Sequence, residues 1–291
     1  MTNDIKYVIV PDVHGRDFYE HDVNMFLENT DDAKIIFLGD YIDPYPKENI
    51  TPDSALKRFK NIIKIKKKYP ERITLLIGNH DFHYIDGSRR GCRMDYYNKD
   101  EICSLLINNL DLFDYIKCER IGKKNFIFSH AGFCFQWFSY HSDIFGVCDP
   151  DNHDEDVKIK AFTYNTIKNI DIKGLSADRN ILNIIGEIGL SRGGWCNHPS
   201  FIWADVTDIL MDNDVNVANC IQVFGHTMQN VGRPLRFDNC FCLDCQKVFY
   251  INDKGTVLTD QYKVIRRNGE EYKKAYLEYL KIYSSYINLR G

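Results

Sequence analysis

Short apolar runs of strand length recur along this chain and predict a set of buried β-strands. Five of these runs end directly in a cluster of polar residues: 6–11, 35–38, 73–77, 126–128 and 221–224. In open α/β sheets, ligands bind in the crevice at the carboxyl ends of the strands. We therefore expect the polar clusters to form a binding site along one edge of a sheet.

Two helices are predicted between the first three runs. Residues 18–28 carry apolar side chains at helical spacing. A second helix is predicted to be capped by Asp53 or Ser54 and to end at Lys68, because Pro70 follows. The alternation of strands and helices indicates the α/β fold class.

The pattern changes after Gly225, where the sequence predicts strands at 241–243, 247–251 and 257–258. The chain then ends in a segment with aromatic and aliphatic residues at helical spacing, which predicts a terminal helix.

The segment 139–205 is polar and irregular in period, which is typical of a cap or insert at a substrate entrance. We expect one domain over residues 1–265, with 139–205 as its cap-like part, and a C-terminal helix over 266–291 packed on it.

Composition favours a soluble, folded chain. Of 291 residues, 44% are hydrophobic and 27% are charged, which suits a chain with a large folded core. The net charge of −4 provides no field that would attract nucleic acid or an anionic membrane. No apolar run could span a bilayer, and no signal-peptide pattern is present. The ten scattered cysteines favour reduced thiols, so we expect a cytoplasmic protein.

The polar clusters contain the side chains that first-row divalent metals prefer. In chain order they are Asp12, His14, Asp40, Asn79, His130 and His226. Asp12 and His14 are one residue apart and can reach a single ion. Asp40 can bridge two ions, since one shared anion offsets their repulsion, and the amide and the other imidazoles can hold the second ion. We predict a site for two divalent ions, about 3.5–4 Å apart.

Five motifs follow one another between residue 7 and about residue 245. They are Asp12-Val-His14-Gly15, Gly39-Asp40-Tyr-Ile-Asp43, Gly78-Asn79-His80-Asp81, His130-Ala-Gly132 and Gly225-His226-Thr227. In this order they resemble the calcineurin-like metallophosphoesterases and, within them, the phosphoprotein phosphatases. The resemblance implies a four-layer α/β/β/α sandwich of two mixed β-sheets.

The resemblance also implies the ligand sets and the reaction. Asp12, His14 and Asp40 would hold the first ion, and Asp40, Asn79, His130 and His226 the second. A hydroxide bridging the ions would attack a phosphomonoester, while His80, oriented by Asp43, protonates the leaving group. Manganese is the expected metal, with iron or zinc as alternatives, and the expected substrate is a phosphoprotein or a nucleotide.

Two positions depart from the phosphoprotein phosphatase pattern. Pro44-Tyr45 stands where Arg-Gly usually follows the second aspartate, and Asp81 replaces a glutamate. Because the missing arginine grips phosphate, another residue must meet that charge. The candidates are Arg89, Arg90 and Arg93, with Arg192 and Arg179 as further ones.

The substrate has two competing interpretations. The stretches Gly-Asn-His-Asp-Phe-His83 and Ser-His130-Ala-Gly-Phe-Cys-Phe-Gln136-Trp137 are similar to bacterial symmetrical diadenosine tetraphosphate hydrolases. By contrast, Phe201-Ile-Trp203-Ala-Asp205 resembles a segment of the Ser/Thr protein phosphatases. For a nucleotide substrate, Tyr41 and Trp137 are the candidates to stack on a base.

Two other functional classes are weighed against these. A pseudo-phosphatase that serves only as a binding module usually lacks metal ligands, and here all six are present. Many phosphodiesterases and nucleases of the family carry a second histidine where this chain has Met228. The sequence therefore favours an active phosphatase.

Overall fold

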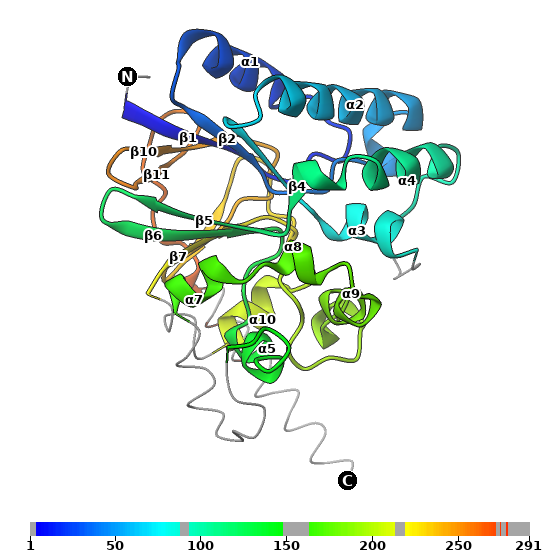
Figure 1. The fold of residues 1–291 in the computed structure, drawn as a ribbon. Helices are drawn as coiled ribbons and strands as arrows, with labels where there is room; N and C mark the ends of the chain where they lie inside the picture. Colours follow the sequence, from blue (N-terminus) through cyan, green and yellow to red (C-terminus); the bar gives the residue numbers. More distant parts are fainter. Residues whose placement is uncertain are drawn as a thin grey trace.

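Two mixed β-sheets form the centre of the protein, and helices cover their outer faces (Figure 1). The computed structural model describes residues 4–87, 93–147, 163–212 and 219–271, together with 274 and 278. The arrangement confirms the predicted α/β fold with two mixed sheets.

The first sheet contains three of the strands predicted to end at the site, β1, β2 and β3, which run parallel. A fourth strand, β4, extends the parallel set, while β10 and β11 add antiparallel pairs at the other edge. In spatial order the described strands are β11 (Val257–Leu258), β10 (Phe249–Asn252), β1 (Ile5–Val10), β2 (Lys34–Phe37), β3 (Ile73–Leu76) and β4 (Phe113–Asp114).

The second sheet contains the other two predicted strands, β6 and β7, which also run parallel. In spatial order its described strands are β5 (Ile116–Ile121), β6 (Lys124–Ser129), β7 (Ile221–Phe224), β9 (Cys240–Cys242) and β8 (Leu235–Phe237). The outer strands β5 and β8 are antiparallel to their neighbours. β4, β5 and β8 were not predicted, because their sequences lack a continuous apolar run.

Alternating side chains of each strand face two different cores. Tyr7 and Ile9 of β1 lie in the cluster between the sheets, with Phe126 and Phe128 of β6. Val8 of β1 lies in the larger cluster, which also contains the buried faces of the helices. This alternation follows from the two-residue period of a strand.

Helices α1 (Glu20–Asn29) and α2 (Pro52–Lys68) cover the first sheet (Figure 1). The cap of α2 differs from the prediction: Thr51 Oγ1 accepts a hydrogen bond of 3.2 Å from the Ser54 amide. The cap falls at Thr51 because Pro52, with its fixed φ and no N–H, suits the first helical position.

Helices α3 and α4 follow β3, and a group of short helices lies beside the second sheet (Figure 1). The remaining described helices are η2 (Pro46–Glu48), α3 (Asn79–Asp86), α4 (Lys99–Ile107), η3 (Leu110–Leu112), α5 (Phe135–Tyr140), α7 (Tyr164–Asn169), α8 (Ile172–Leu175), α9 (Arg179–Ile185), η4 (Leu190–Arg192) and α10 (Val206–Met211).

The described part of 139–205 contains several short helices joined by turns and loops, and its role as a cap stays a prediction. The predicted helix over 266–291 lies mostly outside the described residues. Among the described helices, none has the length and apolar character needed to cross a membrane.

Candidate metal centre

The predicted ligands come together where the carboxyl ends of strands from both sheets meet. Each follows its strand directly or within a few residues, and α3 begins at Asn79. None is more than 9% exposed: Asp12, His14, Asp40, Asn79, His130 and His226. The polar clusters thus lie close together, but at the carboxyl ends of strands from two sheets rather than along one edge of a single sheet.

The backbone is left-handed at four of the predicted site residues: His14 (φ 45°), Asp40 (φ 54°), Asp43 (φ 59°) and His226 (φ 63°). Non-glycine residues rarely adopt this conformation, and such strain gathers at functional sites. It turns the chain sharply just after the strands, at the residues whose side chains form the centre.

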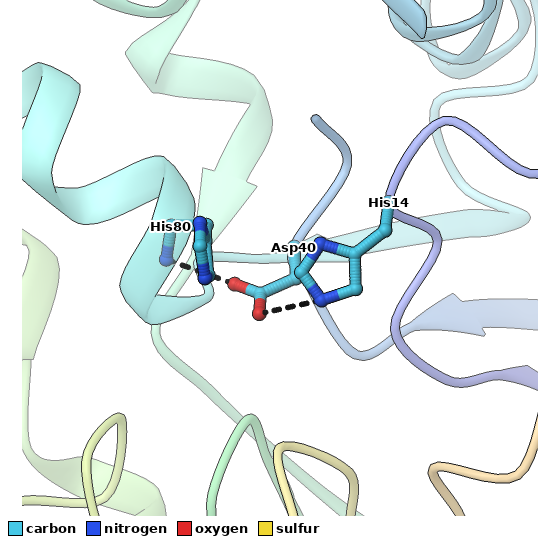
Figure 2. A group of neighbouring side chains, drawn as sticks. All are labelled: His14, Asp40 and His80. Atoms are coloured by element: carbon cyan, nitrogen blue, oxygen red, sulfur yellow. Dashed lines mark hydrogen bonds and ion pairs between the residues drawn. The ribbon is translucent and has the colours of Figure 1, made fainter. Parts of the chain in front are cut away.

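The carboxylate of Asp40 lies between two groups of metal-binding side chains. Its Oδ1 accepts a 2.9 Å hydrogen bond from the His80 amide, and its Oδ2 is 3.4 Å from His14 Nε2 (Figure 2). The same Oδ2 is 3.5 Å from His130 Nε2. Asp40 thus belongs both to a group with His14 and His80 and to one with His130 and His226, each with ligand atoms within 4.8 Å of one another.

The second group has the electronic character of a cation site. Asn79 Oδ1 is 3.0 Å from both His130 Nε2 and His226 Nδ1, and these nitrogens are 3.1 Å apart. The Nδ1 of His130 donates to the Leu38 carbonyl, so Nε2 of a neutral ring presents a lone pair. Burial lowers the pKa of His226 well below its usual value, which favours a neutral ring at His226. An amide oxygen and two imidazole nitrogens this close together are a donor set that first-row divalent metals prefer, so these residues fit such an ion.

His14 is held in the form that a metal requires. Its Nδ1 donates to the Ile42 carbonyl at 3.0 Å, which leaves a lone pair on Nε2 facing Asp40. Burial lowers the pKa of His14 to about 3, so the ring is neutral near pH 7.

Asp12 contacts the His226 loop rather than the His14 ring. Both of its carboxylate oxygens accept from the His226 amide, at 2.8 and 3.1 Å. Burial, with the nearby charge of Asp40, raises the pKa of Asp12 to about 6. Among the described residues, the group of candidate ligands around His14 contains Asp40 and His80 but not Asp12.

The predicted pair of His80 and Asp43 is in contact. His80 Nδ1 lies 2.8 Å from Asp43 Oδ2. Burial alone would raise the pKa of Asp43, but hydrogen bonds with His80, His83 and Tyr84 outweigh it and lower that pKa. The carboxylate is therefore charged and can hold the His80 ring in one orientation.

Sequence reasoning missed the rest of the network around Asp43. Tyr84 Oη donates to its Oδ1 at 2.7 Å, the Asp95 amide donates at 3.0 Å, and His83 Nε2 is 3.3 Å from Oδ2. His83 and Tyr84 lie three and four positions after His80 on α3. That spacing puts them on one face of a helix and could have identified them.

The arginines predicted to bind phosphate differ in where they lie relative to the centre. Arg89 and Arg90 lie outside the described residues. Arg192 lies beside the His226 loop, where Nη2 donates to Thr227 Oγ1 at 3.0 Å and Nε lies 2.9 Å from Asp205 Oδ2. Arg16, which sequence reasoning missed, is buried next to Asp12, donating at 3.3 Å to its carbonyl and at 2.9 Å to both carboxylate oxygens of Glu48.

The predicted base-stacking role is wrong for Tyr41 and for Trp137, because both rings are buried. The left-handed turn at Asp40 directs Tyr41 back into the core, where its hydroxyl donates to the Leu76 carbonyl at 2.9 Å. Trp137 donates to Glu187 at 2.8 Å and is packed against Phe201.

A family model and several solved structures are similar to this chain. A family model described as calcineurin-like phosphoesterase matches residues 5–230. A Saccharomyces cerevisiae protein serine/threonine phosphatase with similarity to human PP5 aligns at 14% identity and a TM-score of 0.47, over 92% of this chain and 82% of its own. A cold-active protein-tyrosine phosphatase of a Shewanella species aligns at 17% identity and a TM-score of 0.44, over 88% and 80%. The Escherichia coli phosphoesterase YfcE aligns at 10% identity and a TM-score of 0.36, over 90% and 97%.

Proposed function

Because the chain belongs to the calcineurin-like phosphoesterase family of hydrolases, we propose that it hydrolyses phosphomonoesters with two divalent metal ions at this centre. The observation that carries the proposal is the position of Asp40, whose carboxylate is shared by two groups of candidate ligands. A carboxylate shared in this way suits a pair of cations, because it offsets their mutual repulsion.

We assign Asp12, His14 and Asp40 to the first ion. Asp40, Asn79, His130 and His226 are assigned to the second. These oxygen and imidazole ligands, with no thiolate, suit manganese, with iron and zinc as alternatives. When bound, the ions would activate a water molecule as nucleophile and neutralise charge on the phosphoryl oxygens.

His80 supplies the general acid in this proposal. With Nδ1 held by Asp43, the opposite ring nitrogen is the atom that can donate a proton to the leaving oxygen. The centroid of the His80 ring lies 5.0 Å from that of His14, and both flank Asp40 (Figure 2). A leaving group above Asp40 would therefore meet this proton donor.

The proposed substrate is a phosphoprotein or a nucleotide. Arg192 is proposed as one contact to it, since its side chain is 30% exposed and adjoins the His226 loop. Arg89 and Arg90 stay in the proposal on sequence grounds alone. The burial of Tyr41 and Trp137 removes the two rings proposed to stack on a base, so the phosphatase is favoured over a dinucleoside polyphosphate hydrolase.

The location proposed for this activity is the cytoplasm. Free thiols are found at Cys103, Cys118, Cys134, Cys220, Cys242 and Cys245, which suits a reducing compartment. Cys240, Cys242 and Cys245 are buried, and none of the described groups that could hold a metal includes a cysteine.

A substrate panel with Mn²⁺ tests the proposal. The panel contains an aryl phosphate, a phosphoserine and a phosphotyrosine peptide, a nucleoside monophosphate and diadenosine tetraphosphate. We expect the protein to hydrolyse the monoesters. Both the Asp40→Asn substitution and chelation of the metal should abolish this turnover. Preferred cleavage of the dinucleotide would instead support the alternative, and no turnover by metal-loaded protein would support a binding module.

A further inference from the structure

We propose that Arg93, held flat against the ring of Tyr45, binds the phosphate group of the substrate on the His14 side of the centre. The inference rests on the proposed function and names a residue that recognises the charge of the substrate. It begins from an electrostatic requirement of the site.

The centre contains the buried carboxyl groups of Asp12, Asp40 and Asp43. A phosphate monoester brings further negative charge, and metal ions would offset only part of the total. An arginine side chain can offset the remaining negative charge, because its planar fork of N–H donors matches the oxygens of a phosphate. Pro44 stands where the phosphoprotein phosphatases carry such an arginine, so the charge must come from elsewhere in the chain.

Arg93 reaches the centre from the segment before α4. Its Cζ lies 3.6 Å from the centroid of the Tyr45 ring, within the range of a cation–π contact. The Tyr45 ring in turn meets the edge of His14, at 5.1 Å between centroids. The guanidinium is thus one aromatic ring away from a predicted metal ligand.

A second contact fixes the guanidinium relative to the general acid. Nε and Nη2 of Arg93 lie 3.4 and 3.2 Å from the backbone carbonyl of Asp43, to which they donate. The side chain of Asp43 holds the His80 ring. A phosphate bound by Arg93 would therefore lie next to the residue that protonates its leaving group.

The charge of Arg93 is also less compensated than that of its neighbours. Arg16 is paired with Glu48 and Arg192 with Asp205, each at 2.9 Å. Among the described residues, no carboxylate forms an ion pair with Arg93; its anchors are a carbonyl and an aromatic ring. Since a guanidinium has five N–H donors, this anchoring leaves donors for an anionic oxygen.

Four variants test the inference in the metal-loaded, full-length protein. Arg93→Gln removes the charge, and Arg93→Lys keeps it without the fork. Tyr45→Leu removes the platform, and Tyr45→Phe keeps it. The matched control is Arg120→Gln, which removes an exposed arginine of β5. The readouts are KM and kcat for an aryl phosphate, the inhibition constant of inorganic phosphate, and bound metal per chain.

We expect Arg93→Gln to raise KM and the inhibition constant of phosphate together, by roughly 10- to 100-fold, the effect of losing hydrogen bonds to a charged group. Arg93→Lys and Tyr45→Leu should give smaller increases and Tyr45→Phe a smaller one than Tyr45→Leu, while the control Arg120→Gln should resemble wild type. Metal content should be unchanged throughout. The inference would be overturned if Arg93→Gln kept the wild-type KM and inhibition constant of phosphate. It would also be overturned if loss of metal explained an increase in these constants.

The test also separates this inference from the proposed function. If the wild-type protein hydrolyses no phosphate ester, the proposed function fails, and calorimetric binding of inorganic phosphate decides the role of Arg93. Weaker binding by Arg93→Gln than by wild type would then support the inference. Equal binding, or no binding by either protein, would overturn it.

Discussion

His80 and Asp43 form a hydrogen-bonded pair, with Nδ1 of the imidazole 2.8 Å from Oδ2 of the carboxylate. Two further donors, the Tyr84 hydroxyl and the Asp95 amide, hold the other oxygen of Asp43. These two hydrogen bonds fix the orientation of the Asp43 carboxylate, and the carboxylate in turn fixes the orientation of the His80 ring. A proton donor needs such a fixed orientation.

His80→Ala should slow hydrolysis of an alkyl phosphate by about 10²–10⁴-fold, the usual contribution of a general acid. An aryl phosphate with a good leaving group needs little protonation, so its kcat should fall much less. Steady-state kinetics with both substrates measure the difference. Equal losses on the two esters would argue against His80 as the acid.

Metal affinity should depend on pH through Asp12. A metal ion binds the charged carboxylate, and burial raises the pKa of Asp12 to about 6 in the metal-free protein. Below that pH a proton competes, so Mn²⁺ affinity should fall as pH drops and level off above it. His14 adds no such dependence there, because burial lowers its pKa to about 3.

Calorimetric titration with Mn²⁺ between about pH 5 and about pH 7.5 measures this dependence. Asp12→Asn should bind more weakly but with a flatter pH profile. An equally steep profile in that variant would assign the dependence to another group.

Gly225→Ala should weaken metal binding without preventing folding. A Cβ at this position would clash with Oδ2 of Asp12 and push the carboxylate away from the centre. Gly87→Ala is the control, because a Cβ there meets nothing within 4 Å, although its φ of 72° is strained. The control should lose about 1 kcal/mol of unfolding free energy and keep its metal. Full metal content in Gly225→Ala would show that Asp12 is not needed at the centre.

Arg192→Gln distinguishes two roles for an arginine beside the His226 loop. If Arg192 contacts the substrate, as proposed, KM should rise by up to about 10-fold while bound metal stays constant. Its bonds to the His226 carbonyl and to Thr227 Oγ1 give it a second possible role, in holding that loop. Loss of metal at unchanged KM would make it a positioning residue instead.

The strand ends could be predicted from sequence because the chemistry there is local. A buried strand needs an apolar run, and a residue such as Asp40 or His226 directly follows one. Within each sheet the parallel strands bring such residues to the same end, but Asp40 and His226 belong to different sheets and meet only because the two sheets pack together. The same reasoning could not predict the contact between the Arg93 guanidinium and the Tyr45 ring, because this contact joins segments with no shared periodicity.

The wrong predictions for Tyr41 and Trp137, and the missed strand β5, also have physical causes. Tyr41 and Trp137 follow site residues closely in the chain, yet nearness in sequence does not decide which way a ring points. The left-handed backbone at Asp40 sends Tyr41 inward, against Phe59. Strand β5 escaped prediction because its interior, Lys117 to Arg120, is mostly polar and only partly buried.

The central claim is that Asp40 joins two ions in one centre, and metal stoichiometry tests it most directly. After loading with Mn²⁺ and removal of excess metal, wild-type protein should retain close to two ions per chain. Asp40→Asn, which keeps the shape of the side chain but removes its charge, should retain less than one and lose turnover. A single ion in wild-type protein, or two ions and full activity in Asp40→Asn, would contradict the account.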